Sequence, residues 1–214
     1  MLDQVDSFLQ GKPRARDFLA LAAGAVLPLS FAPFDYWFLS IVCIIALLLS
    51  LTEATQARGA WRFYLFAVGM YGTGVSWIYV SIHTYGGAGP LLAGFLVAGF
   101  VLSFSIISLL HGFVYMRFVR VLPLGLVVGF PCLWVIQEWF RTWLLTGFPW
   151  LFAGYAHLST PLSGYGPVFG VLGISFAVML TATLLYQLAW RSHPRRAVVL
   201  VGALAGIWLG GYGM

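Results

Sequence analysis

The sequence predicts an all-α integral membrane protein built as a bundle of about seven transmembrane helices. Hydrophobic residues make up 61% of the 214 residues and charged residues 8%, which is typical of membrane proteins and not of soluble domains. The chain also divides into apolar runs that approach the roughly 20 residues a helix needs to cross a bilayer. The predicted spans are 18–34, 36–52, 61–82, 90–116, 121–140, 162–189 and 197–213.

The basic residues indicate the direction in which these helices cross. If residue 1 lies in the cytoplasm, ten of the eleven Lys and Arg residues fall in cytoplasmic segments, and Arg141 alone falls outside. Lys and Arg are retained in cytoplasmic loops during insertion, so we expect a cytoplasmic N-terminus and a C-terminus on the outer side. The ten are Lys12, Arg14, Arg16, Arg58, Arg62, Arg117, Arg120, Arg191, Arg195 and Arg196.

The domain organisation follows from this topology. Residues 1–16 form a short cytoplasmic lead, and residues 17–214 form one polytopic membrane domain. An odd number of crossings places residue 214 outside, and the loops are too short to contain a soluble domain. Two interpretations fit: a bare bundle, or the membrane half of a protein whose outer part is missing here.

Three further features of the sequence bear on individual spans and on their packing. The first two runs are short and are joined by a turn at 32–35, so two tilted spans are favoured over a hairpin that reaches partway. The basic start before the first run resembles a signal peptide, but no small-residue cleavage site follows, so we expect a retained span. Small residues at four-residue spacing, such as Gly202, Gly206 and Gly210, predict close helix packing.

The composition excludes several kinds of site. The net charge of +5 is spread over four cytoplasmic segments and forms no basic and aromatic strip, so we expect no nucleic-acid partner. The histidines lack metal-ligand spacing, which predicts no metal site. Cys43 and Cys132 fall inside predicted spans, where a thiol stays protonated, so we interpret both as apolar filler and expect no disulfide.

Aromatic residues concentrate at the predicted outer side. Five of the nine tryptophans fall there, and they are Trp37, Trp77, Trp139, Trp143 and Trp150. An interfacial aromatic belt explains part of this excess. The remainder favours an outer cavity that is lined with rings and open sideways to lipid.

Two neighbouring motifs lie at this outer side. Glu138 and Arg141 are three residues apart and share a helical face, either as a surface ion pair that ends the helix or as the rim of a headgroup site. After them, Gly147 permits an unusual backbone conformation and Pro149 stiffens the turn. This turn presents two large rings, Phe148 and Trp150, in a defined direction.

These strings together resemble a known family, the bacterial apolipoprotein N-acyltransferases, over their N-terminal membrane region. The matching strings are LSFAPFD at 29–35, GVSWIYVSI at 74–82, EWFR at 138–141, and LTGFPW at 145–150 followed by Gly154 and Tyr155. A weaker match runs through 161–164 and 170–171. The strings occur in the family's order and cover nearly the whole chain.

The resemblance implies a multi-pass enzyme of the bacterial inner membrane that acts in lipoprotein maturation. Such an enzyme transfers an acyl chain from a phospholipid to the N-terminal diacylglyceryl-cysteine of a lipoprotein, without a cofactor. Its Glu-Lys-Cys triad lies in a periplasmic, nitrilase-like domain that begins about where this chain ends. The resemblance therefore implies no catalytic residue in this chain, which we expect to position lipid without catalysing.

The residues expected to position lipid or substrate are Trp77, Glu138, Arg141, Gly147, Phe148, Pro149, Trp150 and Tyr155. The expected partners are membrane lipids, the phospholipid donor and the lipoprotein acceptor. Two alternatives remain open: a small-molecule transporter, which would need polar residues at mid-membrane depth, and a non-catalytic membrane scaffold.

Overall fold

The computed structural model describes residues 2–189 and 194–213, and every regular element in these residues is helical. The α-helices are α1 (Leu2–Leu9), α2 (Pro13–Val26), α3 (Phe38–Ser50), α4 (Gln56–Gly74), α5 (Trp77–Val80), α6 (Pro90–Phe104), α7 (Ile106–Val114), α8 (Phe130–Arg141), α9 (Gly166–Ala189) and α10 (Pro194–Gly213). Short 3₁₀ or π segments are η1 (Leu27–Ser30), η2 (Ser81–Tyr85), η3 (Tyr115–Val119), η4 (Gly125–Gly129), η5 (Leu144–Thr146), η6 (Ala153–His157) and η7 (Pro161–Tyr165). The all-α prediction is thus confirmed for this part of the chain.

Local sequence signals explain where several helices begin. Pro13 and Pro90 occupy the first turns of α2 and α6, where a missing backbone N–H costs no hydrogen bond. Thr55 precedes α4, and its side chain accepts a hydrogen bond from the backbone N–H of Arg58 at 3.3 Å.

The predicted seven spans correspond to helical segments of unequal length. Three segments are long and apolar enough to cross a membrane: 90–119, 161–189 and 195–213. A fourth qualifies if α4 and the segment 77–85, which bend by 50° at their junction, are taken together. The helices in the remaining runs, α2, α3 and α8, contain 14, 13 and 12 residues. The count of seven therefore stays a prediction.

The core forms where α2, α3, α4, α7, α8 and α9 meet. Its fully buried side chains include Ile44, Phe63, Phe130 and Met179. Helices α2 and α4 approach each other closely, because a Cβ atom added to Gly24 would lie 1.9 Å from the carbonyl oxygen of Phe66. Only glycine permits this separation, and such contact is how helices associate where apolar burial gives little drive.

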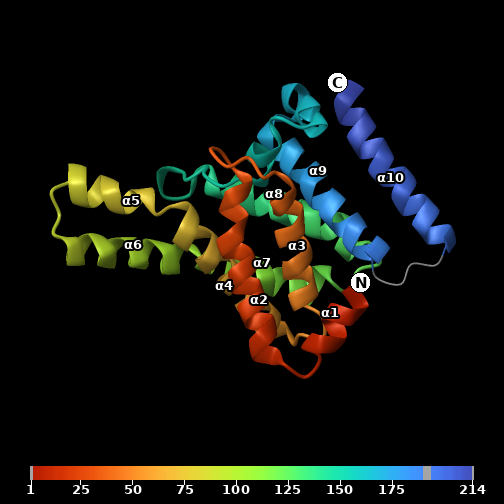
Figure 1. Cartoon of the computed structure of the whole chain (residues 1–214), viewed down its shortest axis with the longest axis horizontal. Coiled ribbons are helices and arrows are strands. Elements are labelled where there is room, and N and C mark those ends of the chain that lie inside the picture. Colours follow the sequence, from red (N-terminus) through yellow and green to blue (C-terminus); the bar gives the residue numbers. More distant parts are fainter. Residues whose placement is uncertain (1, 190–193, 214) are drawn as a thin grey trace.

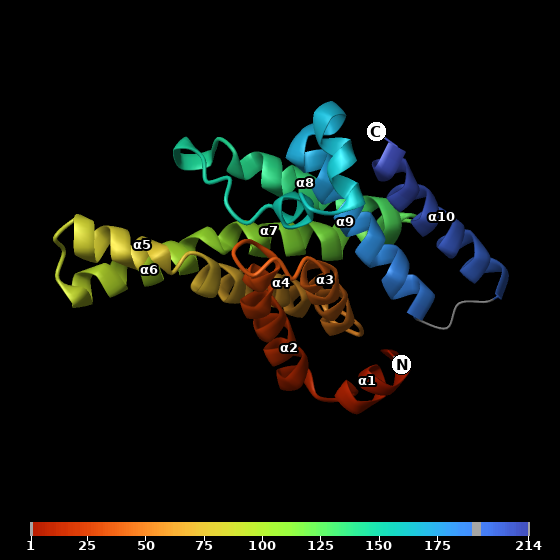
Figure 2. The ribbon, with the colours of Figure 1, turned by 45° about the horizontal axis from the view of Figure 1, so that its top comes forward.

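The small-residue face predicted along α10 makes close contact only at its C-terminal end, where a Cβ atom added to Gly210 would lie 2.8 Å from the hydroxyl oxygen of Tyr165. A Cβ atom added to Gly202 or Gly206 would meet no heavy atom within 4 Å among the described residues. Instead, α10 lies along one edge of the molecule beside α9, while α5 and α6 project side by side on the opposite side (Figures 1 and 2). Large apolar side chains on both regions, such as Phe95 and Leu209, are exposed.

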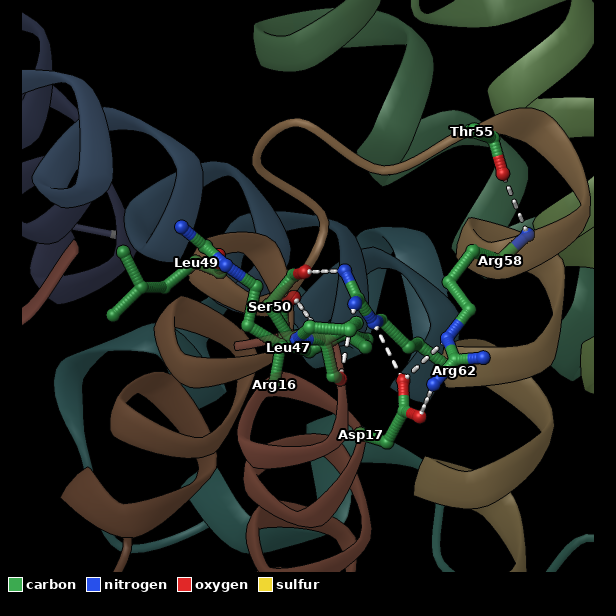
Figure 3. A network of polar contacts seen from close by, with 9 residues as sticks. Arg16, Asp17, Leu47, Leu49, Ser50, Thr55, Arg58 and Arg62 are labelled. Carbon is green, nitrogen blue, oxygen red and sulfur yellow. Dashed lines mark hydrogen bonds and ion pairs between the residues drawn. The ribbon is translucent and has the colours of Figure 1, made fainter. Parts of the chain in front are cut away.

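A buried polar network joins the start of α2, the end of α3 and the start of α4 (Figure 3). Asp17 forms ion pairs with both Arg58 and Arg62. Arg62 also donates to the carbonyl of Ser50, and Arg16 donates to that of Leu49 at 2.7 Å. The network brings two segments with predicted cytoplasmic cations, the starts of α2 and α4, to the end of α3.

Candidate functional site

A groove of about 610 Å³ lies at the C-terminal end of α4, away from the polar network at its start. It is formed by η1, the start of α5 and the segment 149–158. Four of the eight predicted positioning residues line it: Trp77, Pro149, Trp150 and Tyr155. Pro28, Phe31 and Phe34 form the facing wall. The structure therefore brings three separate sequence motifs, 28–34, 74–77 and 149–155, to one surface.

Aromatic rings contact one another in and beside this groove. The ring centroids of Trp77 and Trp150 are 5.8 Å apart, and those of Phe148 and Trp150 are 5.2 Å apart in a stacked arrangement. Phe148 continues inward to Phe104, at 5.3 Å. Trp77, Trp150 and Tyr155 are between 43% and 48% exposed, so the groove presents open ring faces while Phe148 anchors them to the interior.

The turn that carries these rings depends on glycine. Gly147 has φ of +94°, and an added Cβ would lie 2.3 Å from the carbonyl oxygen of Thr142. The next residue, Phe148, donates its backbone N–H to the carbonyl of Arg141 at 2.7 Å. A side chain at 147 would be strained both in conformation and in space, so the predicted special conformation is present.

Glu138 lies directly behind the segment 149–158 and is fully buried. Its Oε1 accepts hydrogen bonds from the indole N–H of Trp134 at 2.9 Å and from the backbone N–H of Ala153 at 2.8 Å. Its Oε2 is buried and has no hydrogen-bond partner among the described residues. Glu138 thus ties the loop to α8.

Arg141 holds the same loop at a second point. Its Nη1 donates to the hydroxyl of Tyr71 at 2.8 Å and to the carbonyl of Trp150 at 3.1 Å. The guanidinium also lies 4.8 Å from the centroid of the Phe152 ring, a cation–π contact. Moving the backbone of Trp150 away would leave the buried Arg141 guanidinium without one of its hydrogen-bond acceptors, which is costly. The contact with Arg141 therefore holds the Trp150 backbone in place.

The expectation of a surface ion pair between Glu138 and Arg141 is wrong. Both side chains are at most 1% exposed, and the four ion pairs found in the described part of the chain do not include them. Each carries its own hydrogen bonds to the loop instead. Neither lies at the rim of the groove, so any role in positioning lipid is exerted through Trp150 and Ala153.

Two partners of this cluster were not foreseen from the sequence. Trp134 precedes Glu138 by four residues on α8, a spacing that places side chains together and could have indicated the contact. Tyr71, in contrast, is 70 residues from Arg141 and carries no local signal. Its hydroxyl is a polar group in an apolar run, and such groups need a buried partner.

The cysteines and histidines considered in the sequence, so far as the structure describes them, do not line the groove. Cys43 is buried and Cys132 exposed, and both are free. No group of three or more His, Cys, Asp or Glu residues within 2–189 and 194–213 could hold a metal ion. His157 is buried beside the groove, where its Nε2 lies 2.9 Å from the Ser40 hydroxyl, and burial lowers its pKa to about 4. His193 lies outside the described residues.

Comparison with known proteins gives a consistent result. The family model for the apolipoprotein N-acyltransferase N-terminal domain matches residues 23–184, a range that contains all eight predicted positioning residues. Apolipoprotein N-acyltransferases of Pseudomonas syringae pv. tomato and Pseudomonas paraeruginosa are both 45% identical to this chain, over 88% and 90% of its length. The corresponding protein of Coxiella burnetii is 41% identical over 79%. The matched regions are 36% to 38% of these relatives, so the chain spans less than two-fifths of their length.

Proposed function

This chain belongs to the apolipoprotein N-acyltransferase family, and we propose that it forms the membrane-embedded region that receives and orients lipid for acyl transfer. The donor would be a phospholipid and the acceptor the diacylglyceryl-cysteine of a lipoprotein, in the bacterial inner membrane. The observation that carries this proposal is the ring-lined groove, in which residues of three motifs meet. Apolar ring faces with a few polar groups suit an acyl chain and its ester end.

The proposed membrane arrangement is seven spans, with residues 1–16 in the cytoplasm and 17–214 as one domain whose C-terminus is periplasmic. The structure supports it because segments predicted on the same side meet. The hydroxyl of Thr52 contacts that of Tyr186 at 3.4 Å, and Arg120 donates to the carbonyl of Ala54. At the opposite end, the segments near 31, 77 and 150 share the groove. In this proposal α2 and α3 belong to two tilted spans, which we favour over a hairpin that reaches only partway across the membrane.

The eight residues divide into three proposed roles. Trp77, Pro149, Trp150 and Tyr155 would contact lipid directly, because they line the groove. Gly147 and Phe148 would shape the turn. Glu138 and Arg141 would position the loop through Ala153 and Trp150.

We also propose that this chain alone does not catalyse transfer. Covalent acyl transfer needs an activated nucleophile with a base within hydrogen-bond reach. Cys43 lies in the packed core, and neither Cys43 nor Cys132 makes a recorded hydrogen bond to a base in the described residues. Lipid positioning and catalysis are therefore separable in an experiment on the chain itself.

A photoreactive phosphatidylethanolamine, with a diazirine in its acyl chain, tests both proposals in reconstituted vesicles. We expect cross-links at Trp77 and in 149–158, reduced about fivefold by Trp150→Ala, because one aromatic contact contributes about 1 kcal/mol. Trp139→Ala is the matched control, since this exposed ring lies outside the groove. Equal labelling of both variants would refute the groove, and a thioester on either cysteine would refute the non-catalytic proposal.

A further inference from the structure

A second pocket lies at the end of the molecule opposite the aromatic groove. It has a volume of about 770 Å³ and opens between the end of α9, the start of α10, and the segments η3 and η4. The end of α3 and the residues after it close its base through Leu51 and Thr52. None of the eight predicted positioning residues lines this pocket, so it is separate from the candidate functional site.

Three arginines line this pocket: Arg120, Arg195 and Arg196. Arg120 donates to the carbonyl of Ala54 at 3.3 Å, a neutral partner. Three of the carboxylates at this end of the molecule, on residues whose side chains the structure describes, are engaged elsewhere. Asp17 pairs with Arg58 and Arg62, and Asp6 and Glu53 pair with Arg16 (Figure 3 shows Asp17 with its partners).

The consequence is a division of the basic residues into two sets. Arg16 and Arg62 are buried and neutralised within the protein. Over the ranges that the structure describes, no carboxylate pairs with any of the three pocket arginines. Three guanidinium groups without an internal counter-charge around one cavity attract an anion, and guanidinium geometry matches the oxygens of a phosphate.

The remaining wall of the pocket is mainly aliphatic, with polar groups from Thr52 and Gln187. Leu48, Leu126, Val199 and Leu200 line it beside the arginines, and Tyr115 adds a phenol. A free inorganic anion would gain nothing from such a wall. A phospholipid would gain from both parts, because its phosphate meets the arginines while the start of an acyl chain covers the leucines and valine.

We propose that this pocket binds an anionic phospholipid of the cytoplasmic leaflet, with the headgroup phosphate on Arg120, Arg195 and Arg196. The choice of leaflet rests on the proposed membrane arrangement. A zwitterionic lipid also carries a phosphate, but its ammonium group is repelled by the same three cations. The bound lipid would connect the start of α10 to η3 and η4. It would thereby stabilise the position of α10, which lies along the edge of the molecule beside α9 (Figure 1).

The test uses the purified chain in a neutral detergent and measures binding and melting temperature with added lipid. We expect phosphatidylglycerol to bind at least about tenfold more tightly than phosphatidylcholine, a difference worth about 1.4 kcal/mol. The triple variant Arg120→Gln, Arg195→Gln, Arg196→Gln should lose this preference. The control, Lys12→Gln with Arg14→Gln and Arg117→Gln, removes the same charge outside the pocket and should keep affinity within about twofold.

Specific outcomes would overturn the proposal. Equal loss of preference in both triple variants would show a general surface attraction, and equal affinity of both lipids in the parent chain would show no anionic site. Inorganic phosphate that displaces phosphatidylglycerol at equal concentration would identify a free-anion site. If the pocket triple variant fails to fold, the single variant Arg196→Gln, checked by circular dichroism, decides. The lipid-binding and cross-linking experiments have independent outcomes. The proposal for the aromatic groove can therefore be refuted without refuting the proposal for this pocket.

Discussion

At the scale of single residues, the loop beside the aromatic groove is held by two ionisable side chains that act separately. Glu138 accepts the backbone N–H of Ala153, and Arg141 donates to the carbonyl of Trp150. The sequence indicated that these two residues are unusual, since ionisable groups near membrane depth are expensive. It could not indicate that each is buried and bound to the loop, because Tyr71 and Ala153 are distant in sequence from the residues they contact.

His157 provides a pH-dependent contribution to stability. It lies between the sixth predicted span and the fifth, and burial lowers its pKa from 6.5 to about 4. Between these values the unfolded chain binds a proton that the folded chain excludes, so the unfolded state is favoured as the pH falls. The stabilisation is complete above about pH 6.5 and is lost towards pH 4 at roughly 1 kcal/mol per pH unit.

We therefore expect the thermal unfolding midpoint in detergent to fall between pH 7 and pH 5. His157→Gln should lower the midpoint at pH 7, because the contacts with Ser40 and Trp37 are weakened. The same variant should lose less than the parent chain on acidification, since Gln does not titrate. An identical pH dependence in both proteins would contradict the assignment to His157.

At the scale of elements, close contact between α2 and α4 sets the framework on which the groove is built. Backbone approaches backbone at Gly24 and Gly69, and η1 continues directly from α2 into the groove wall. The position of the wall relative to Trp77 therefore depends on the α2 to α4 distance. Four-residue glycine spacing predicted such contacts on α10, but periodicity alone does not say which glycines face a partner, and Gly202 faces none within 4 Å.

Alanine substitutions on α4 test this contact. A Cβ atom at Gly69 would lie 2.2 Å from the carbonyl oxygen of Leu21, so Gly69→Ala must push the helices apart. We expect a destabilisation of about 1–3 kcal/mol, typical of overpacking. Gly72→Ala is the matched control on the same helix, with no neighbour within 4 Å, and should be neutral or stabilising by up to about 1 kcal/mol. Unfolding midpoints of the two variants that do not differ would refute the close contact.

At the scale of the whole molecule, the two ends of the bundle differ in chemistry. The end that gathers the starts of α2, α4 and α10 carries the buried arginine network and the basic pocket. The other end carries the aromatic groove. This polarity agrees with the direction of insertion that the Lys and Arg distribution predicts, in which cations remain in the cytoplasm.

Cysteine labelling in spheroplasts tests the proposed arrangement. In a background with Cys43→Ala and Cys132→Ala, single cysteines replace three exposed residues, Gln10, Tyr85 and Tyr212. We expect a membrane-impermeant maleimide to label positions 85 and 212 in intact spheroplasts, and position 10 only after lysis. Protection of position 212 together with position 10 would place both ends on one side and show that the number of crossings is even.

The amino-acid sequence is sufficient to predict a helical, apolar chain with an asymmetric distribution of charge, and to find the strings that it shares with the family. These properties depend on composition and local order, because transfer into lipid and retention of cations are summed residue by residue. The tertiary structure alone decided that α4 and α5 bend by 50°, that Arg141 meets Tyr71, and that Arg120 shares a pocket with Arg196. Such contacts join residues far apart in the chain, and their geometry is fixed by how whole helices pack, which no local pattern encodes.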